Sequence, residues 1–251
     1  MKLYMYCYDG SDSSAKKLGF PYGGHPPGYL EEHRNEVIVR WGNSRQIGSR
    51  IGLEDYPFVL NPRTSIYHNC DKLAATSKLA EVVGTPRLYR HRIPPGVTAV
   101  VRPIEHEQGV GFTIVKGPYD IPSGHYATEF IKTDMECRVW FCGTKAMVGK
   151  REKSLDHSEH PCRSGWGYEF RTSGRTGRAI VFDPIMIGET LRAAKKIGLD
   201  CGAADVLYKT GECFFLELNS APAIDHWRIT SFFQTNLPLC AQEKYGVTVT
   251  A

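Results

Sequence analysis

Long apolar runs are missing from this sequence of 251 residues, and it contains no stretch of 18 apolar residues that would span a membrane. The apolar N-terminus reaches Asp9 too early to form the core of a signal peptide. The eight cysteines include no C-x-x-C pair, which favours free buried thiols over a disulfide framework. These absences predict a cytoplasmic protein without a membrane partner.

A strong excess of charge of one sign is also missing. The formal net charge is +4, which allows an anionic small ligand but gives no strong nucleic-acid signal. The chain shows no internal repeat, no low-complexity tract and no evident Ser-His-Asp or Cys-His arrangement. With 41% hydrophobic and 23% charged residues, its composition is that of an ordinary globular protein.

The chain changes character near residue 90. Before that point, alternating apolar strands, a helical pattern and a Gly/Pro-rich loop predict a small α/β lobe over 1–90. Its expected elements are strands at 3–8, 36–41 and 57–62 and a helix at 71–83 capped by Asn69 or Asp71. After it, strands with tight turns at 97–102, 111–115, 127–131, 138–142 and 145–149 precede a loop at 152–178 and a helix from Pro184 to Gly198.

The most informative segment is the hairpin that follows this helix. Two apolar runs, joined by the turn at 209–212, carry Asp205, Glu217 and Asn219. Strand side chains alternate between faces, so Glu217 and Asn219 point to one side and Asp205 on the neighbouring strand can join them. Such an all-oxygen pocket suits Mg²⁺, although the three residues also fit ordinary solvated strand and turn positions.

A candidate phosphate site lies upstream. The strand ending at Arg102 leads into a loop containing Gly109 and Gly111, whose backbone amides could approach phosphate oxygens, although a plain hairpin turn is the alternative. Glu129 and Glu136 follow on later strands, where they also fit as edge-strand charges.

The order of these segments resembles that of the ATP-grasp superfamily, and within it the RimK-like amino-acid ligases and related carboxylate–amine ligases. The resemblance runs from about residue 58 to residue 225. It is carried by Asp71-Lys72, Arg102-Pro103 with the glycine loop, Glu129-Phe130-Ile131, Glu136-Cys137-Arg138, Lys150-Arg151, and D-V-L from Asp205 followed by L-E-L-N-S-A-P from Leu216.

The resemblance implies an α+β ATP-grasp fold with a small N-terminal α/β lobe (1–90), a β-rich nucleotide lid (91–131) and a C-terminal α+β metal-binding lobe (132–251). It also implies a role for each matching residue. Metal ligands would be Asp205, Glu217 and Asn219; ATP contacts would come from Lys72, Arg102, Gly109, Gly111, Glu129, Phe130, Ile131 and Glu136; the transferred phosphate would face Arg151 and Arg138.

The activity implied is amide formation between a carboxylate and an amine, of small molecules or peptides, through an acyl phosphate, with ATP and Mg²⁺ as cofactors and Mn²⁺ as an alternative metal. A kinase that phosphorylates a hydroxyl and an ATP-binding regulator without turnover are the alternatives. Arg102 stands where ATP-grasp proteins commonly have Lys. His226, beyond the metal segment, either orients an incoming amine or packs structurally.

Overall fold

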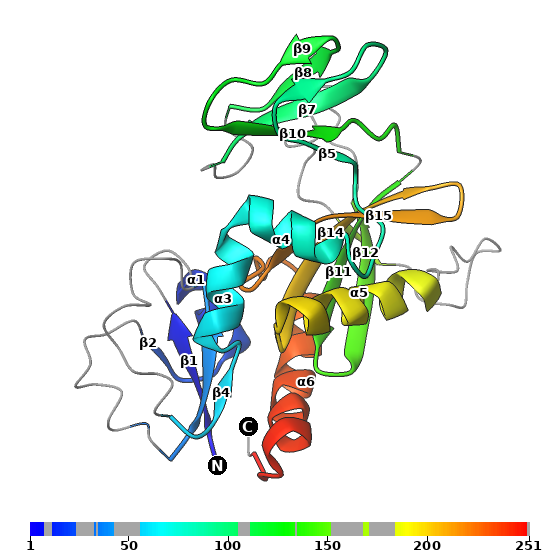
Figure 1. The fold of residues 1–251 in the computed structure, drawn as a ribbon. Helices are drawn as coiled ribbons and strands as arrows, with labels where there is room; N and C mark the ends of the chain where they lie inside the picture. The colour runs from blue at the N-terminus through cyan, green and yellow to red at the C-terminus, as the bar shows by residue number, and fades with distance from the viewer. Residues whose placement is uncertain are drawn as a thin grey trace, which may run out of the picture.

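The chain is built around β-sheets in three regions, as its computed structural model shows (Figure 1). The structure describes residues 1–7, 12–23, 33, 35–42, 56–104, 111–133, 135–151, 168–170 and 184–249. Together the sheets and their helices form the α+β arrangement that the sequence predicted.

The N-terminal sheet is parallel, with strand order β2-β1-β3-β4. Every residue of its two longer strands is buried, as expected for a parallel sheet covered on both faces. Two strands predicted here are confirmed, although Tyr8 lies outside the described residues. The elements are β1 (Leu3–Cys7), α1 (Asp12–Leu18), β2 (Tyr22–Gly23), β3 (Val37–Trp41) and β4 (Val59–Leu60).

Two helices, α3 (Arg63–Cys70) and α4 (Lys72–Leu79), follow this sheet. Asp71 caps the second one, because its Oδ1 accepts a hydrogen bond of 3.0 Å from the N–H of Ala74. The predicted helix at 71–83 is therefore confirmed in type but ends earlier. Helix α4 packs against the C-terminal part of the chain, which brings Lys72 to the edge of another sheet.

The region named the lid from here on begins at residue 88, slightly before the expected boundary at 91. Its strands are β5 (Leu88–Tyr89), β6 (Arg92–Ile93), β7 (Thr98–Pro103), β8 (Thr113–Lys116), β9 (Tyr119–Asp120) and β10 (His125–Glu129). Its main sheet is antiparallel in the order β5-β10-β7-β8, and β6 pairs with β9. A small core of its own holds it together: Tyr89, Ile93, Ala99, Val101 and Ala127. The lid lies beyond one end of the central strands (Figure 1).

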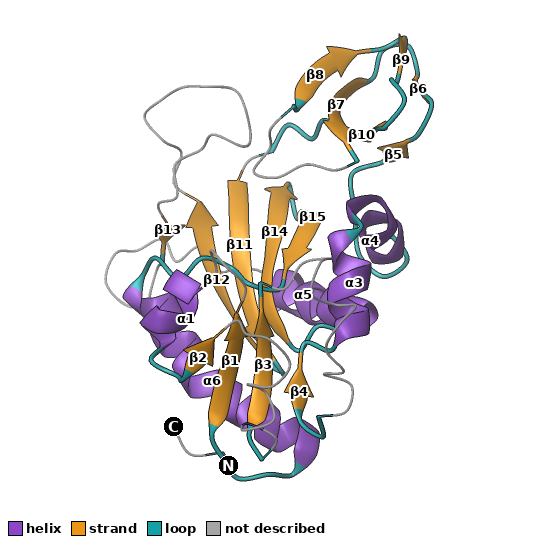
Figure 2. Ribbon diagram, turned by 90° about the vertical axis from the view of Figure 1, so that its left-hand side faces the viewer, coloured by secondary structure: helices purple, strands orange, loops and turns teal. Residues whose placement is uncertain are grey.

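The central sheet is antiparallel, in the order β13-β12-β11-β14-β15. Its elements and their helices are β11 (Met135–Cys142), β12 (Lys145–Arg151), β13 (Tyr168–Glu169), α5 (Pro184–Ile197), β14 (Cys201–Lys209), β15 (Glu212–Asn219) and α6 (Trp227–Tyr245). Helices α5, α3 and α4 lie on one side, and α1 and α6 lie on the other (Figure 2). Two apolar cores therefore sandwich this sheet.

Local sequence signals explain the turns of this region. Gly143 (φ 57°) allows the tight turn between β11 and β12. Thr210 and Gly211 both have positive φ, which matches the primed turns that twist with a hairpin. Helix α5 ends just before Gly198, as predicted, and Gly198 has the left-handed conformation (φ 88°) common in glycines that follow a helix.

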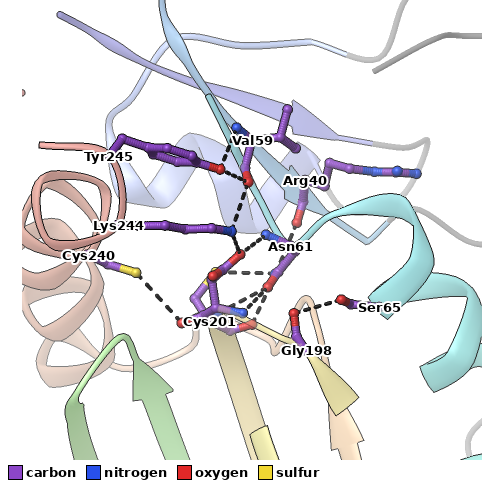
Figure 3. A network of polar contacts seen from close by, with 10 residues as sticks. Arg40, Val59, Asn61, Ser65, Gly198, Cys201, Cys240, Lys244 and Tyr245 are labelled. Atoms are coloured by element: carbon purple, nitrogen blue, oxygen red, sulfur yellow. Dashed lines mark hydrogen bonds and ion pairs between the residues drawn. The ribbon is translucent and has the colours of Figure 1, made fainter. Parts of the chain in front are cut away.

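A buried junction at Asn61 joins the N-terminal sheet to the central sheet (Figure 3). The Asn61 side-chain oxygen accepts hydrogen bonds from the N–H groups of Asp200 (2.8 Å) and Cys201 (3.1 Å). The Asn61 N–H donates to the Asp200 carboxylate (2.7 Å), which also accepts from Lys244 of α6 (2.8 Å). Because these bonds link three elements in a buried place, the two sheets form one body.

The seven cysteines in the described part of the chain are free, as predicted, and Cys162 lies outside it. Burial raises the pKa of the Cys137 thiol to about 12, so this group is protonated at neutral pH. Among the helices that the structure describes, none is both long enough and apolar enough to cross a membrane.

Candidate active site between the lid and the central sheet

The β14–β15 hairpin brings the three predicted metal ligands onto one face of the central sheet. Asp205 lies directly opposite Glu217, and Ala203 lies opposite Asn219. A β-bulge next to Asp205 shifts the register of the remaining pairs. The predicted juxtaposition of these three side chains is therefore present.

Arg138 extends this row onto β11, where it lies opposite Asp205. Its Nε donates to Asp205 Oδ1 at 2.6 Å and its terminal nitrogen donates to Oδ2 at 2.8 Å. The two side chains are only 6% and 10% exposed. This geometry is the bidentate arginine–carboxylate pair, which is stronger and more directional than a single ion pair.

Lys72 approaches the same row from α4. Its Nζ lies 3.2 Å from Glu217 Oε2, and Asn219 donates to Glu217 Oε1 at 3.2 Å. Burial by itself would raise the pKa of Glu217, but Lys72 and Asn219 outweigh it and lower that pKa to about 2. Burial by itself would lower the pKa of the Lys72 amine, because it disfavours the charged form. The nearby Glu217 carboxylate outweighs burial, so the pKa of Lys72 is raised. Both groups are therefore charged at neutral pH.

The lid contributes Arg102, which a set of neutral side chains holds in place. Its terminal nitrogen donates to Thr128 Oγ1 at 2.9 Å, and the guanidinium carbon lies 4.9 Å from the centre of the Phe112 ring. Tyr126 lies directly opposite Arg102 in the β7–β10 register. Within the described residues, the buried Arg102 Nε has no hydrogen-bond partner.

Tyr126 lies opposite Arg102 and lines the same cleft as Lys72 and Glu217. Burial raises the pKa of its hydroxyl, while Arg102 and Lys72 act in the opposite direction and Arg102 also hydrogen-bonds to it. The phenol is therefore neutral at physiological pH and serves as a hydrogen-bonding group.

A small cleft lies between α4, the lid strands and β15. Its lining combines cations, hydroxyls and a carboxylate with a few apolar groups: Asn69, Lys72, Ala75, Thr76, Leu79, Arg102, Tyr126, Leu216, Glu217 and Leu218. Such a lining has the character of a site for an anion that carries metal ions.

The predicted nucleotide residues Glu129, Phe130 and Ile131 lie where the lid joins the central sheet. The Glu129 N–H donates to the carbonyl of Arg87 (2.8 Å), and the Phe130 N–H donates to the carbonyl of Thr98 (2.9 Å). These bonds fix the start of the connection to β11. Glu136 lies two residues before Arg138 on that strand, so both side chains point to the same face.

Three further residues were predicted to contact ATP or the transferred phosphate: Gly109, Gly111 and Arg151. Gly111 has φ 79°, and a Cβ there would lie 3.0 Å from the Pro103 ring, so glycine suits this turn. Gly109 lies outside the described residues. Of Arg151 only the backbone is described; it pairs with Tyr168 at the end of β12. The predicted loop at 152–178 also lies outside the described residues, apart from 168–170.

His226 is the N-cap of α6. Its Nδ1 accepts a hydrogen bond from the Arg228 N–H (3.2 Å), and its ring lies 4.6 Å from that of Phe170. These contacts favour the packing role over a role in orienting the amine.

Sequence reasoning missed the residues that hold Arg102, namely Phe112, Tyr126 and Thr128. Tyr126 and Thr128 share one face of β10 by simple alternation, which is a usable signal. Their contact with Arg102 depends on the register between β7 and β10, and no residue pattern in the sequence indicates that register. Among the described His, Cys, Asp and Glu side chains, no group of three is placed to hold a metal ion. The predicted ligand set is not such a group, because its third member, Asn219, is an amide.

No protein-family model matches the chain, and no curated protein matches it. Solved structures do match. D-alanine–D-alanine ligase from Bacillus anthracis is similar with a TM-score of 0.66 at 12% identity, covering 97% of this chain and 96% of that one. The same enzyme complexed with ATP gives a TM-score of 0.65.

Two other structures extend the comparison. A putative ATP-grasp superfamily protein from Archaeoglobus fulgidus has a TM-score of 0.58 at 15% identity and covers 100% of this chain and 89% of that one. N5-carboxyaminoimidazole ribonucleotide synthetase from Thermus thermophilus has a TM-score of 0.61 at 13% identity, covering 94% and 77%. The predicted ATP-grasp fold is therefore confirmed, whereas the RimK-like branch stays a prediction.

Proposed function

We propose that this protein is an ATP-dependent carboxylate–amine ligase, which forms an amide or peptide bond and releases ADP and phosphate. The observation that carries the proposal is the row Asp205, Glu217 and Asn219 on one face of the central sheet, of which Glu217 lines a cleft together with Lys72 and Arg102. The likeness to D-alanine–D-alanine ligase and to a carboxyaminoimidazole ribonucleotide synthetase supports the ligase class.

The donor set fits Mg²⁺, because Asp205, Glu217 and Asn219 offer only oxygen ligands and Mg²⁺ prefers carboxylates completed by phosphate and water. When bound, Mg²⁺ would neutralise charge on the ATP phosphates. Lys72 and Asn219 lower the pKa of Glu217 to about 2, which supports this role, since an ionised carboxylate is the required ligand.

The chain's own groups would then divide the remaining work. Arg102 and Lys72 would hold phosphate oxygens, with Arg102 orienting them through its fixed planar guanidinium. Arg138 and Arg151 would face the transferred phosphate and stabilise the charge that develops on it. Glu129, Phe130 and Ile131 would meet adenine, and Glu136 the ribose.

No nucleophilic side chain is required for this chemistry. The substrate carboxylate attacks the γ-phosphorus, the bond to the bridging oxygen of ADP breaks, and an acyl phosphate forms. An amine then attacks the acyl carbon and phosphate leaves, with loss of one proton from the amine. The protein's contribution is to position the reactants, stabilise charge and exclude water.

The test is an ADP-release assay with mixtures of amino acids and small carboxylates, followed by mass spectrometry of the products. ADP release that requires both a carboxylate and an amine supports the ligase. A phosphorylated hydroxyl compound would indicate the kinase, and tight ATP binding without ADP would indicate a regulator.

Glu217→Gln tests the metal ligand directly, because it removes the charge of the side chain and keeps its shape. We expect it to reduce ATP turnover by about a thousandfold or more, as expected when a required metal ligand is lost. Unchanged turnover in this variant would remove Glu217 from the metal site.

A further inference from the structure

Each carboxylate of the candidate metal site already has a cation of the protein bound to it. Arg138 holds both oxygens of Asp205, at 2.6 and 2.8 Å. Lys72 lies 3.2 Å from Glu217. The two negative charges and the two positive charges cancel, so this four-residue group has no net charge.

A neutral group of this kind is a poor site for a free divalent cation. A metal ion that binds Asp205 shares oxygens that already accept hydrogen bonds from the guanidinium, and it meets two positive side chains at short range. The cost is high because the Arg138 and Asp205 side chains are almost fully buried.

The total charge of the site is different when a metal ion arrives together with a triphosphate. The phosphate oxygens bring negative charge into the cleft, where Lys72 can exchange its carboxylate for a phosphate oxygen. Arg138 lies outside the lining of the cleft, but its charge acts on Glu217, and its side chain can make the same exchange by turning toward the cleft. The carboxylates then become available as metal ligands, and neither cation loses an anionic partner. The balance of charges in the site therefore favours binding of the metal ion together with the nucleotide over binding of the metal ion alone.

Arg102 shows that the cations of this site are of two kinds. Its described contacts are with Thr128, Phe112 and Tyr126, all neutral, and no described carboxylate forms an ion pair with it. It can receive phosphate without giving up any of the described carboxylates. Lys72 and Arg138, in contrast, each release a carboxylate when they move to phosphate.

We propose that Arg138 and Lys72 are resident counter-ions of the metal site: they keep Asp205 and Glu217 neutralised until a nucleoside triphosphate enters, so that divalent metal is taken up only together with the nucleotide. The released Arg138 then becomes a ligand of the phosphate groups. This inference rests on the proposed function, because it requires that the cleft binds a triphosphate.

The experiment measures Mn²⁺ binding to the full chain by isothermal titration calorimetry and by the electron paramagnetic resonance signal of free Mn²⁺. Titrations are made without nucleotide and with saturating adenylyl imidodiphosphate, which is not hydrolysed. We expect the Mn²⁺ dissociation constant without nucleotide to be at least about tenfold weaker than with it, after correction for Mn²⁺ bound by the analogue alone.

Lys72→Met is the decisive variant. It removes one positive charge and leaves the group of Asp205, Glu217, Arg138 and the substituted residue 72 with a net charge of −1, while Glu217 keeps access to solvent with 34% of its side chain exposed. We expect Mn²⁺ to bind this variant without nucleotide about tenfold more tightly than it binds the unmodified protein. Arg192→Met, which removes an exposed cation of α5, is the matched control and should change nothing.

Arg138→Met should have the same effect or a larger one, but it leaves Asp205 buried without its partner. Lys72→Met and the unmodified protein keep the proposal testable if Arg138→Met does not fold. Equal Mn²⁺ affinity with and without nucleotide in the unmodified protein would overturn the proposal, and so would an unchanged nucleotide-free affinity in Lys72→Met.

These outcomes distinguish a failure of the counter-ion role from a failure of the proposed ligase function. If the analogue binds and Mn²⁺ binds equally well without it, the counter-ion role is wrong and the ligase proposal stands. If the analogue does not bind at all, with or without Mn²⁺, both are wrong, because the cleft is then no triphosphate site.

Discussion

The lid and the central sheet supply opposite halves of the candidate site, and they are built differently. The central sheet lies between two large apolar cores, and its charged row is held by a nearly buried ion pair. The lid has a small core, and its cation Arg102 is held by neutral side chains. The acidic half is therefore fixed by the main body of the protein, and the cationic half belongs to a separate, smaller unit.

The difference suggests how the two halves serve one reaction. Metal ligands need fixed geometry, which the well-packed central sheet provides. The described residues of the lid have a small core of their own, and β10 ends at Glu129, shortly before β11 begins at Met135. Regions with small cores open at lower free energy than the main core, so the lid is the part expected to move when a nucleotide enters or leaves.

The buried ion pair offers the strongest test of this contrast. Asp205→Ala should lower the free energy of unfolding by about 3–5 kcal/mol, because it leaves the Arg138 guanidinium buried without a partner. The matched control is Asp120→Ala in the lid, whose ion pair with Arg92 is exposed and should contribute about 1 kcal/mol or less. Urea denaturation measures both. Equal losses in the two variants would contradict the contrast.

Removal of the lid cation should affect binding more than folding. Arg102→Ala should weaken binding of ATP by roughly 10- to 100-fold, in line with the loss of a charge-assisted hydrogen bond to phosphate. Arg92→Ala, on an exposed lid strand, should leave the affinity unchanged. Calorimetric titration with a non-hydrolysable ATP analogue provides the measurement. An unchanged dissociation constant in Arg102→Ala would remove it from the phosphate site.

The charge state of Glu217 should make stability depend on pH. Its folded-state pKa of about 2 lies below the ordinary 4.5, so the charged form favours folding. That contribution is complete above about pH 4.5 and is lost as the pH falls towards 2. Allowing for partial exposure, we expect a loss of about 1–2 kcal/mol.

Denaturation of the unmodified protein and of Glu217→Gln at pH 7 and pH 3 isolates this effect. The difference between the two proteins should shrink at the lower pH. A difference that stays constant across the range would show that Lys72 and Asn219 do not stabilise the carboxylate.

The smallest expected effect concerns the support of Arg102. Thr128→Val removes the hydroxyl that accepts its hydrogen bond and keeps the shape of the side chain. We expect ATP binding to weaken by about two- to tenfold, since one hydrogen bond contributes about 0.5–1.5 kcal/mol. Thr128→Ser should restore the affinity. If Thr128→Val binds ATP like the unmodified protein, the bond does not position the guanidinium.

The acidic half of the site was predictable because its geometry is local. Asp205, Glu217 and Asn219 belong to one hairpin, whose turn at 209–212 is marked by its own residues. The bulge beside Asp205 was not foreseen, since nothing in the two strands announces it. Helices α3 and α6 were also missed, because their stabilisation comes from tertiary packing more than from a strong helical pattern.

The contacts between distant segments lay beyond sequence reasoning. Arg138 was expected near the transferred phosphate, and the fold pairs it with Asp205, 67 residues away. The same holds for Lys72 with Glu217 and for Asn61 with Asp200. Each contact depends on which strands are neighbours and in what register, which a residue pattern leaves open.

The sequence by itself determined the residues that bear the chemistry and their order along the chain, because strand alternation and turn residues act over a few positions. Only the tertiary structure decided that every carboxylate of the row has a cation and that Arg102 has none of the described carboxylates as a partner. Electrostatic pairing acts through space, so it is set by how the sheets and α4 pack against one another.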